Sequence, residues 1–113
     1  MDARGNAVFP LFDDHGLCGL DRRNVGFKGL LPGSIKGLWT SRNFATAPEL
    51  LVVESPVDAL AHYELYQGNT GYISIGGSLS TRQRHLLGNL LAKAMGRRQT
   101  IVAATDNLSL IHI

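Results

Sequence analysis

The sequence predicts an α/β fold in which a parallel sheet with flanking helices follows a short β-rich segment. Three apolar runs of strand length, at residues 50–53, 72–75 and 100–105, are typical of strands buried in a parallel sheet. The two segments between these runs have apolar residues at helical spacing and clear helix start signals. In a β-α-β-α-β order, right-handed crossovers make the strands parallel and cover both faces of the sheet with helices.

Residues 1–45 form the predicted β-rich segment. Residues 7–12 and 17–20 have strand composition and flank turn residues at 13–16, which indicates a hairpin. Pro10 requires an edge position or a bulge, because proline cannot donate a ladder hydrogen bond. Glycines and prolines at 26–33 predict a loop, and residues 35–40 predict a third strand, in which we expect Trp39 to pack in the core. The segment leads into a second predicted unit, residues 46–107.

Both helices are predicted from their first residues. Ser55 can cap the first helix, Pro56 suits its first position, and Asp58 completes a capping box. We expect this helix to end near Gln67. Its predicted buried stripe consists of Val57, Leu60, Ala61 and Leu65. The second helix starts with a capping box at residues 80–83 and ends near Gly96. Its predicted buried stripe consists of Leu86, Leu87, Leu90, Leu91 and Ala94.

The composition is that of one soluble domain. The chain has 113 residues, of which 44% are hydrophobic and 18% charged, against about 25% charged in a typical domain. No apolar run approaches the ~18 residues of a membrane span, and the first residues lack the apolar stretch of a signal peptide. One cysteine, Cys18, excludes a disulfide framework and a cysteine-based zinc site. We therefore expect a cytoplasmic protein without membrane contact.

The charges are unevenly distributed, although the net charge is only +2. Residues 21–42 contain five basic residues and one acid, residues 49–64 contain four acids and no Lys or Arg, and residues 82–98 contain five basic residues and no acid. An acidic centre between two basic stretches suits a polyanion held around a carboxylate-bound metal ion. Solvated surface charge is the alternative interpretation of the same pattern.

Carboxylates and glycines follow the predicted parallel strands. Function in α/β sheets gathers at the carboxyl ends of the strands, which here carry Glu54, the turn at Gly76 and Gly77, and Asp106. Asp58 lies one helical turn beyond Glu54 and can face the same crevice. Mg²⁺ prefers oxygen ligands and is usually held by one or two acids together with phosphates and water. The alternative roles are an exposed strand-end acid for Glu54, a helix cap for Asp58 and a turn residue for Asp106.

Three segments together resemble the TOPRIM domain, the catalytic domain shared by bacterial primases, type IA and type II topoisomerases and some nucleases. They are residues 52–60 (VVESPVDAL), 74–80 (SIGGSLS) and 101–107 (IVAATDN). The family pattern is a strand ending in Glu with an Asp four residues on, then a strand with a Gly turn, then a strand ending in Asp-x-Asp. The resemblance covers about residues 49–107 and implies a Rossmann-like TOPRIM sheet.

The resemblance implies a role for each matching acid. Glu54 corresponds to the catalytic glutamate of the family, which acts as a metal ligand or as a general acid/base in nucleotidyl transfer. Glu54, Asp58 and Asp106 become ligands of Mg²⁺ or Mn²⁺. Asp106 matches the first acid of the Asp-x-Asp pair, whereas the second position holds Leu108.

The first half resembles the segment that precedes this domain in primase-like proteins of plasmids and other mobile elements. The matching stretches are residues 16–24 (GLCGLDRRN) and 33–39 (GSIKGLW). Lys36, Arg22 and Arg23 become candidates for phosphate contacts, because such charges supply much of the affinity for a polyanion. Gly76 and Gly77 are further candidate nucleic-acid contacts, since their turn lets the backbone lie close to substrate, although a plain turn role fits equally well.

Residues 108–113 (LSLIHI) do not continue the predicted pattern. A strand ending near Asp106 should lead into a loop and a helix, but a short apolar tail follows instead. The same six residues are obtained by translating the terminal repeat of a transposon used to prepare sequencing libraries. We therefore predict that they are a sequencing-adapter artefact and that the TOPRIM unit is incomplete, so that this chain by itself is inactive.

The predicted function is that of a module from a Mg²⁺-dependent, primase-like enzyme of bacterial DNA replication, which adds nucleotides on a single-stranded DNA template. The expected partners are DNA, nucleotides and a helicase or other replication proteins. Strand cleavage is possible within the same fold. One alternative is a non-catalytic TOPRIM-like module for DNA binding or docking in recombination or plasmid maintenance. The other is an α/β domain with no nucleic-acid role.

Overall fold

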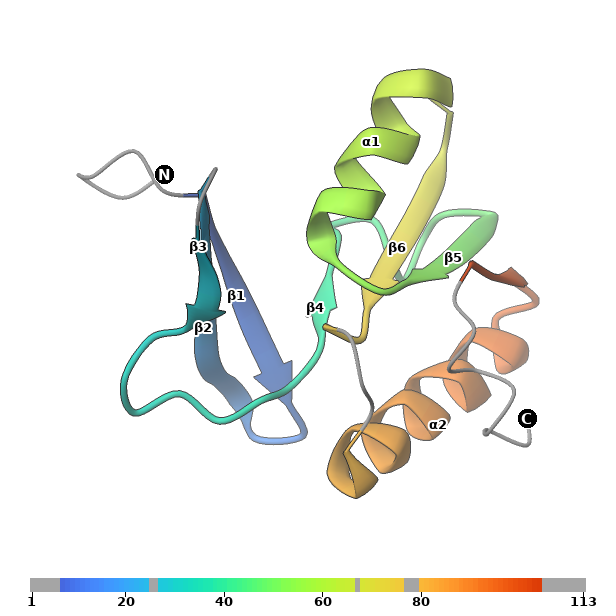
Figure 1. The fold of residues 1–113 in the computed structure, drawn as a ribbon. Helices are drawn as coiled ribbons and strands as arrows, with labels where there is room; N and C mark the ends of the chain where they lie inside the picture. Colours follow the sequence, from blue (N-terminus) through green and yellow to red (C-terminus); the bar gives the residue numbers. More distant parts are fainter. Residues whose placement is uncertain (1–6, 25–26, 67, 77–79, 105–113) are drawn as a thin grey trace.

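The computed structural model describes residues 7–24, 27–66, 68–76 and 80–104 of the chain. Over these residues the chain forms a mixed α/β fold, in which an antiparallel sheet precedes a mixed sheet with two helices (Figure 1). The predicted α/β class and the β-rich N-terminal segment are therefore confirmed. Gly77, Asp106 and the tail at 108–113 lie outside the described residues.

The N-terminal sheet is antiparallel and contains β1 (Ala7–Asp13), β2 (Gly16–Asn24) and β3 (Phe27–Leu30), in that order. Strands β1 and β2 are the predicted hairpin. Strand β1 lies at the edge, and its register shifts between Leu11 and Phe12, which agrees with the edge or bulge expected at Pro10. The stretch predicted as a glycine-rich loop contains β3 instead. Its backbone pairs with β2, and this pairing does not depend on side chains, since Gly29 lies opposite Arg22.

The second sheet has the order β4-β6-β5-β7 and contains β4 (Trp39–Thr40), β5 (Glu49–Val53), β6 (Thr70–Ser74) and β7 (Thr100–Ala103). Strand β5 is parallel to both β6 and β7, as predicted. Strand β4 is antiparallel to β6, so the sheet is mixed rather than purely parallel. The strand predicted at 35–40 is reduced to β4. Just before it, a backbone bridge between Phe12 and Leu38 joins the two sheets.

Helices α1 (Pro56–Tyr66) and α2 (Thr81–Gly96) cover opposite faces of the second sheet (Figure 1). The chain passes from β5 to β6 through α1 and then back past β5 to β7 through α2. Two crossovers of the same hand that run in opposite directions place their helices on opposite faces. The core under α2 consists of Leu38, Leu50, Val52, Ile73, Ile75, Leu87, Leu91 and Ala94. The core under α1 consists of Leu51, Val53, Ala59 and Tyr72.

Two predictions about burial are wrong. The apolar stripe predicted for α1 is exposed, and this helix buries Pro56 and Ala59 instead. The large aromatic side chains of Tyr72 and Trp39 fill this side of the sheet, so the helix presents small residues to it. Strand β7 is mostly exposed at the edge of the sheet rather than buried on both faces. The stripe predicted for α2 is confirmed. Within the described residues, neither helix has the length and apolar content needed to span a membrane.

Candidate functional site

A pocket of about 190 Å³ lies where the N-terminal sheet meets the carboxyl ends of the parallel strands. We call it the strand-end pocket. Its walls come from β1, β2 and β3, from the start of α1 and from the end of β6. The linker before β4, residues 31–38, forms the remaining wall. The pocket is lined by Leu11, Asp21, Arg23, Gly29, Leu30, Lys36, Gly37, Pro56, Ser74 and Gly76. Three of these residues, Arg23, Lys36 and Gly76, were predicted from the sequence as nucleic-acid contacts.

Lys36 and Gly76 lie against each other in this pocket. A Cβ atom placed on Gly76 would be 3.6 Å from Cε of Lys36, so the lysine side chain runs past the glycine. Gly76 has a φ of 71°, which favours glycine. Its N–H lies 3.3 Å from Oγ of Ser74 and donates to it, while Ile75 N–H donates to Val53 O at 3.1 Å. These bonds fix the turn after β6 and hold exposed backbone beside a cationic side chain.

Arg23 forms an ion pair inside the strand-end pocket. Its Nε lies 2.9 Å from Oδ2 of Asp21, and both side chains are at least four-fifths buried. Side chains alternate along a strand, so residues 21 and 23 of β2 share a face and Arg22 takes the opposite one. Arg22, which is partly buried, is accordingly absent from the described lining. The described lining therefore contains the Asp21–Arg23 ion pair and one further basic side chain, Lys36.

The two described metal-ligand candidates lie close together in sequence at the end of β5. Glu54 follows β5 directly and is exposed, and Asp58 is exposed in the first turn of α1. Ser55 caps this helix, since its Oγ accepts the Asp58 N–H at 3.2 Å. The described residues contain no group of three or more His, Cys, Asp or Glu side chains placed to hold a metal ion. Mg²⁺ is often bound through one or two carboxylates with phosphates and water, so the two exposed acids fit it in chemistry.

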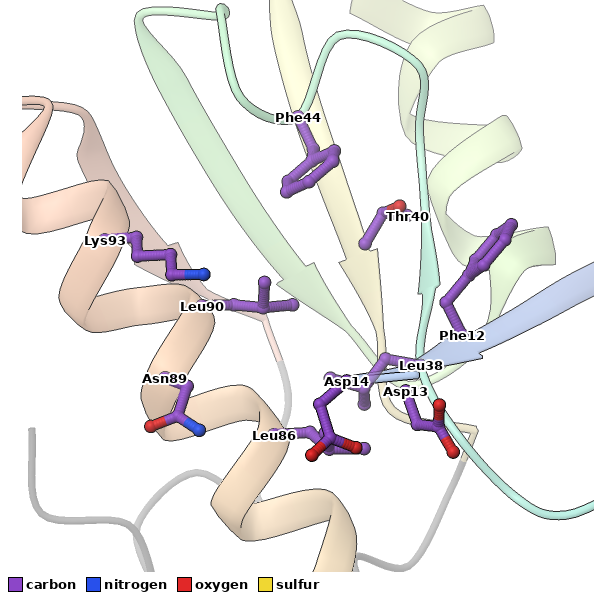
Figure 2. A pocket seen from close by; sticks show the side chains of 10 residues that line it. All are labelled: Phe12, Asp13, Asp14, Leu38, Thr40, Phe44, Leu86, Asn89, Leu90 and Lys93. Atoms are coloured by element: carbon purple, nitrogen blue, oxygen red, sulfur yellow. The ribbon is translucent and has the colours of Figure 1, made fainter. Parts of the chain in front are cut away.

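A second, larger pocket of about 490 Å³ lies beside α2 (Figure 2). We call it the α2-side pocket. Its floor is apolar and includes Leu38, Phe44, Leu86 and Leu90, with charged and polar side chains around them. Figure 2 shows that Leu86, Asn89, Leu90 and Lys93 project from α2 and that Asp13 and Asp14 come from the end of the β1 region. None of the described residues that the sequence singled out for chemistry lines this pocket.

Asp13 and Cys18 have shifted pKa values, but neither shift creates a reactive group. The His15 N–H donates to the Asp13 carboxylate at 2.8 Å and the Arg82 guanidinium pairs with it, so the pKa of Asp13 is lowered. Burial raises the pKa of the Cys18 thiol, which therefore stays protonated. The partly buried Cys18 donates weakly to Leu11 O at 3.5 Å and acts as a packing residue.

Three polar residues that shape the strand-end pocket were not predicted from the sequence. Asp21 and Ser74 line it, and Gln83 supports it from behind with bonds to Gly37 and Ile75. The pairing of Asp21 with Arg23 follows the two-residue strand period, so the pattern in β2 contained that signal. Ser74 and Gln83 gave no such signal, because their partners are distant in the sequence or belong to the backbone.

Comparison of the chain with protein-family models, with curated proteins and with solved structures gave no match.

Proposed function

We propose that this chain is a TOPRIM-like module of a Mg²⁺-dependent nucleic-acid enzyme, with primase-like nucleotidyl transfer on single-stranded DNA as its reaction. The observation that carries the proposal is the strand-end pocket, which brings Lys36, Arg23 and Gly76 together at the carboxyl ends of parallel strands. These residues come from three segments that are far apart in the sequence. They meet at the carboxyl ends of the strands, where open α/β sheets bind their ligands.

The pocket favours a phosphate group over a complete small-molecule ligand. Its volume of about 190 Å³ is below the roughly 300–1,000 Å³ of pockets that enclose drug-sized ligands. Lys36 supplies a cation, and the turn at Gly76 brings main chain close to it. We infer that one phosphate of a DNA strand or of a nucleotide binds between Lys36 and the Gly76 turn.

The metal ion would be held by Glu54, with Asp58 and Asp106 as the other proposed ligands. When bound, Mg²⁺ would supply positive charge to polarise the reacting phosphoryl group. Glu54 is well placed for this role because it follows a parallel strand and is exposed to an incoming substrate. Asp58 is held in the first turn of α1, next to the same strand end.

The binding part of the proposal is tested with two lysine variants of the full chain. A fluorescein-labelled oligothymidylate is titrated at several salt concentrations with wild type, Lys36→Ala and Lys93→Ala. Each lost phosphate contact lowers the salt slope of log K by about 0.7 for single strands. We expect that loss for Lys36→Ala and an unchanged slope for Lys93→Ala, which removes the same charge from the α2-side pocket. Equal slopes for all three proteins would contradict the proposal.

The catalytic part is tested by resequencing and by activity. Amplification of the locus through codon 107 from unfragmented DNA shows whether an acid stands at position 108. With that acid present, we expect Mg²⁺-dependent nucleotide addition on a single-stranded template by the restored chain and none by its Glu54→Gln variant. Failure of the restored chain to add nucleotides would contradict an enzymatic role.

A non-catalytic DNA-binding or docking module is the second candidate function. It is favoured by Leu108, which stands where the TOPRIM pattern has its second acid. A genuine Leu108, together with salt-dependent DNA binding that needs Lys36, would establish this alternative over the enzyme.

A further inference from the structure

Gln83 is the polar side chain that the fold buries most completely in α2. Its relative exposure is 0%, although it occupies the first turn of a helix that begins near the surface. A buried side-chain amide without hydrogen bonds would lower the stability of the fold. The hydrogen bonds of Gln83 therefore show which parts of the chain it joins. Gln83 makes these bonds with three separate parts of the chain.

The Gln83 side chain joins the linker before β4 to the end of β6. Its Nε2 donates to Gly37 O at 2.9 Å and to Ile75 O at 2.8 Å. Its Oε1 accepts the Ser80 N–H at 3.0 Å, which completes the capping box of α2. Both Nε2 protons and one oxygen lone pair are therefore used, and the side chain is fixed in one orientation.

Both carbonyl partners stand next to residues of the strand-end pocket. Gly37 follows Lys36 and itself lines the pocket, and Ile75 precedes Gly76. The Lys36 side chain lies against the backbone of Gly76, since Lys36 Cε is 3.6 Å from a Cβ atom placed on Gly76. Gln83 thus holds both residues through hydrogen bonds to the neighbouring peptide units. It reaches the pocket through the main chain without lining it.

The linker is confined on its other side as well. A Cβ atom on Gly37 would lie 2.5 Å from Phe12 O and 2.6 Å from Cys18 Sγ, which leaves no room for a side chain. Leu38 N–H donates to Phe12 O at 2.9 Å, and Phe12 N–H donates to Leu38 O at 2.8 Å. The linker is therefore hydrogen-bonded to the N-terminal sheet on one side and to Gln83 on the other. Because Gln83 also bonds to Ile75 O at the end of β6, it sets the position of the linker relative to β6.

We propose that Gln83 is a positioning residue for the strand-end pocket, which holds the Lys36 side chain over the Gly76 turn through its two carbonyl bonds. The inference rests on the proposed function, in which Lys36 contacts a phosphate. Gln83 itself does not touch the ligand. Loss of the Gln83 carbonyl bonds should therefore weaken DNA binding as much as loss of the lysine charge does, although Lys36 is still present in the chain.

The test compares Gln83→Met with Ser80→Ala. Methionine keeps the length of the side chain but donates no hydrogen bond. Ser80→Ala weakens the same helix start, because it removes the bond from Gln83 N–H to Ser80 Oγ at 3.1 Å, yet it leaves both carbonyl bonds intact. Ser80→Ala is thus the matched control for destabilisation of α2. Gln83→Glu is the second variant, since its side chain can still accept the Ser80 N–H and its protonated form can donate one carbonyl bond.

Two measurements separate positioning from general damage. In ¹⁵N–¹H spectra without DNA, we expect the amide signals of Lys36 and Gly76 to shift in Gln83→Met and to stay in place in Ser80→Ala. In oligothymidylate titrations, we expect Gln83→Met to lower the salt slope by about 0.7, the loss expected for one phosphate contact. The double variant with Lys36→Ala should lose no more than either single variant, since both remove one interaction.

The outcomes distinguish this inference from the proposed function. If Lys36→Ala leaves DNA binding unchanged, the proposed function fails, and shifted Lys36 and Gly76 signals in Gln83→Met would still support positioning. If Lys36→Ala weakens binding but Gln83→Met affects neither the signals nor the salt slope, the inference is overturned. Unfolding of both Gln83 variants under conditions where Ser80→Ala is folded would also overturn it, because Gln83 would then be a general core residue.

Discussion

The two helices cover the same sheet in opposite ways. Helix α2 brings large side chains to the sheet, and Leu87 and Leu91 have no exposed surface. Helix α1 brings small ones, Pro56 and Ala59, and leaves its larger apolar residues in solvent. The sheet explains the difference, because it carries Tyr72 and Trp39 on the α1 side but aliphatic residues on the α2 side. Both helix–sheet interfaces are filled with side chains. The large side chains belong to the helix at the α2 interface and to the sheet at the α1 interface.

The comparison is sharpest for two leucines. Leu91→Ala opens a cavity under α2 and should lower the free energy of unfolding by about 2–5 kcal/mol. Leu60→Ala changes an exposed position of α1, with a relative exposure of 53%, and should stay within about 0.5 kcal/mol. Urea unfolding of the full chain at 25 °C measures both. Similar losses in the two variants would show that α1 buries its leucines against something in solution.

Enlarging the small residues tests the α1 side directly. Ala59→Leu inserts volume where the sheet already supplies Tyr72, and overpacking of this kind costs about 1–3 kcal/mol. Ala61→Leu makes the same change on the exposed side of α1 and is the control, with an expected change near zero. The same urea experiment distinguishes them. A stable Ala59→Leu variant would mean that unfilled space remains between α1 and the sheet.

The helix starts differ in a smaller but measurable way. Ser80 takes part in a reciprocal capping box, in which its Oγ accepts Gln83 N–H and its own N–H donates to Gln83 Oε1. Ser55 accepts Asp58 N–H at 3.2 Å. Alanine at either cap should cost about 0.5–2 kcal/mol. We expect the greater loss from Ser80→Ala, because α2 covers the larger core, and thermal unfolding of the two variants gives the order.

Local signals predicted both helices and the buried face of α2, but not the buried face of α1. Ser55-Pro56 and Ser80 with Gln83 placed both helix starts, because capping depends on neighbouring residues. The buried face of α1 depends on Tyr72 and Trp39, which reach it from other strands. Apolar spacing alone therefore selected the wrong stripe. Strand β3 was missed for a related reason, since its pairing with β2 uses the backbone of a glycine-containing segment.

The candidate site shows the same division. Lys36, Arg23 and Gly76 were predicted one by one, from charge, motif and turn chemistry. Their meeting in the strand-end pocket depends on long-range contacts made by Gln83 and by the Phe12–Leu38 bridge. The sequence could not indicate those contacts, because a glutamine in a helix start is explained equally well by its capping box. Asp106 and Gly77 stay predictions.

The smallest expected effect is a polar contact on the α1 side. Tyr72 and His62 form a hydrogen bond of 2.6 Å between the phenol oxygen and Nδ1, and Tyr72→Phe should cost about 0.5–1.5 kcal/mol at neutral pH.

Burial, followed by the charges of Glu49 and Tyr63, raises the pKa of Tyr72 above its ordinary value of 10.0. The folded state therefore favours the neutral phenol. That contribution is complete below pH 10.0 and is lost as the pH rises through the higher pKa of the folded state. The free energies of unfolding of wild type and Tyr72→Phe, measured by urea unfolding from pH 8 upwards, should consequently converge above about pH 10. A constant difference across that range would show that Tyr72 titrates alike in the folded and unfolded chain, and would contradict the raised pKa of Tyr72 in the folded state.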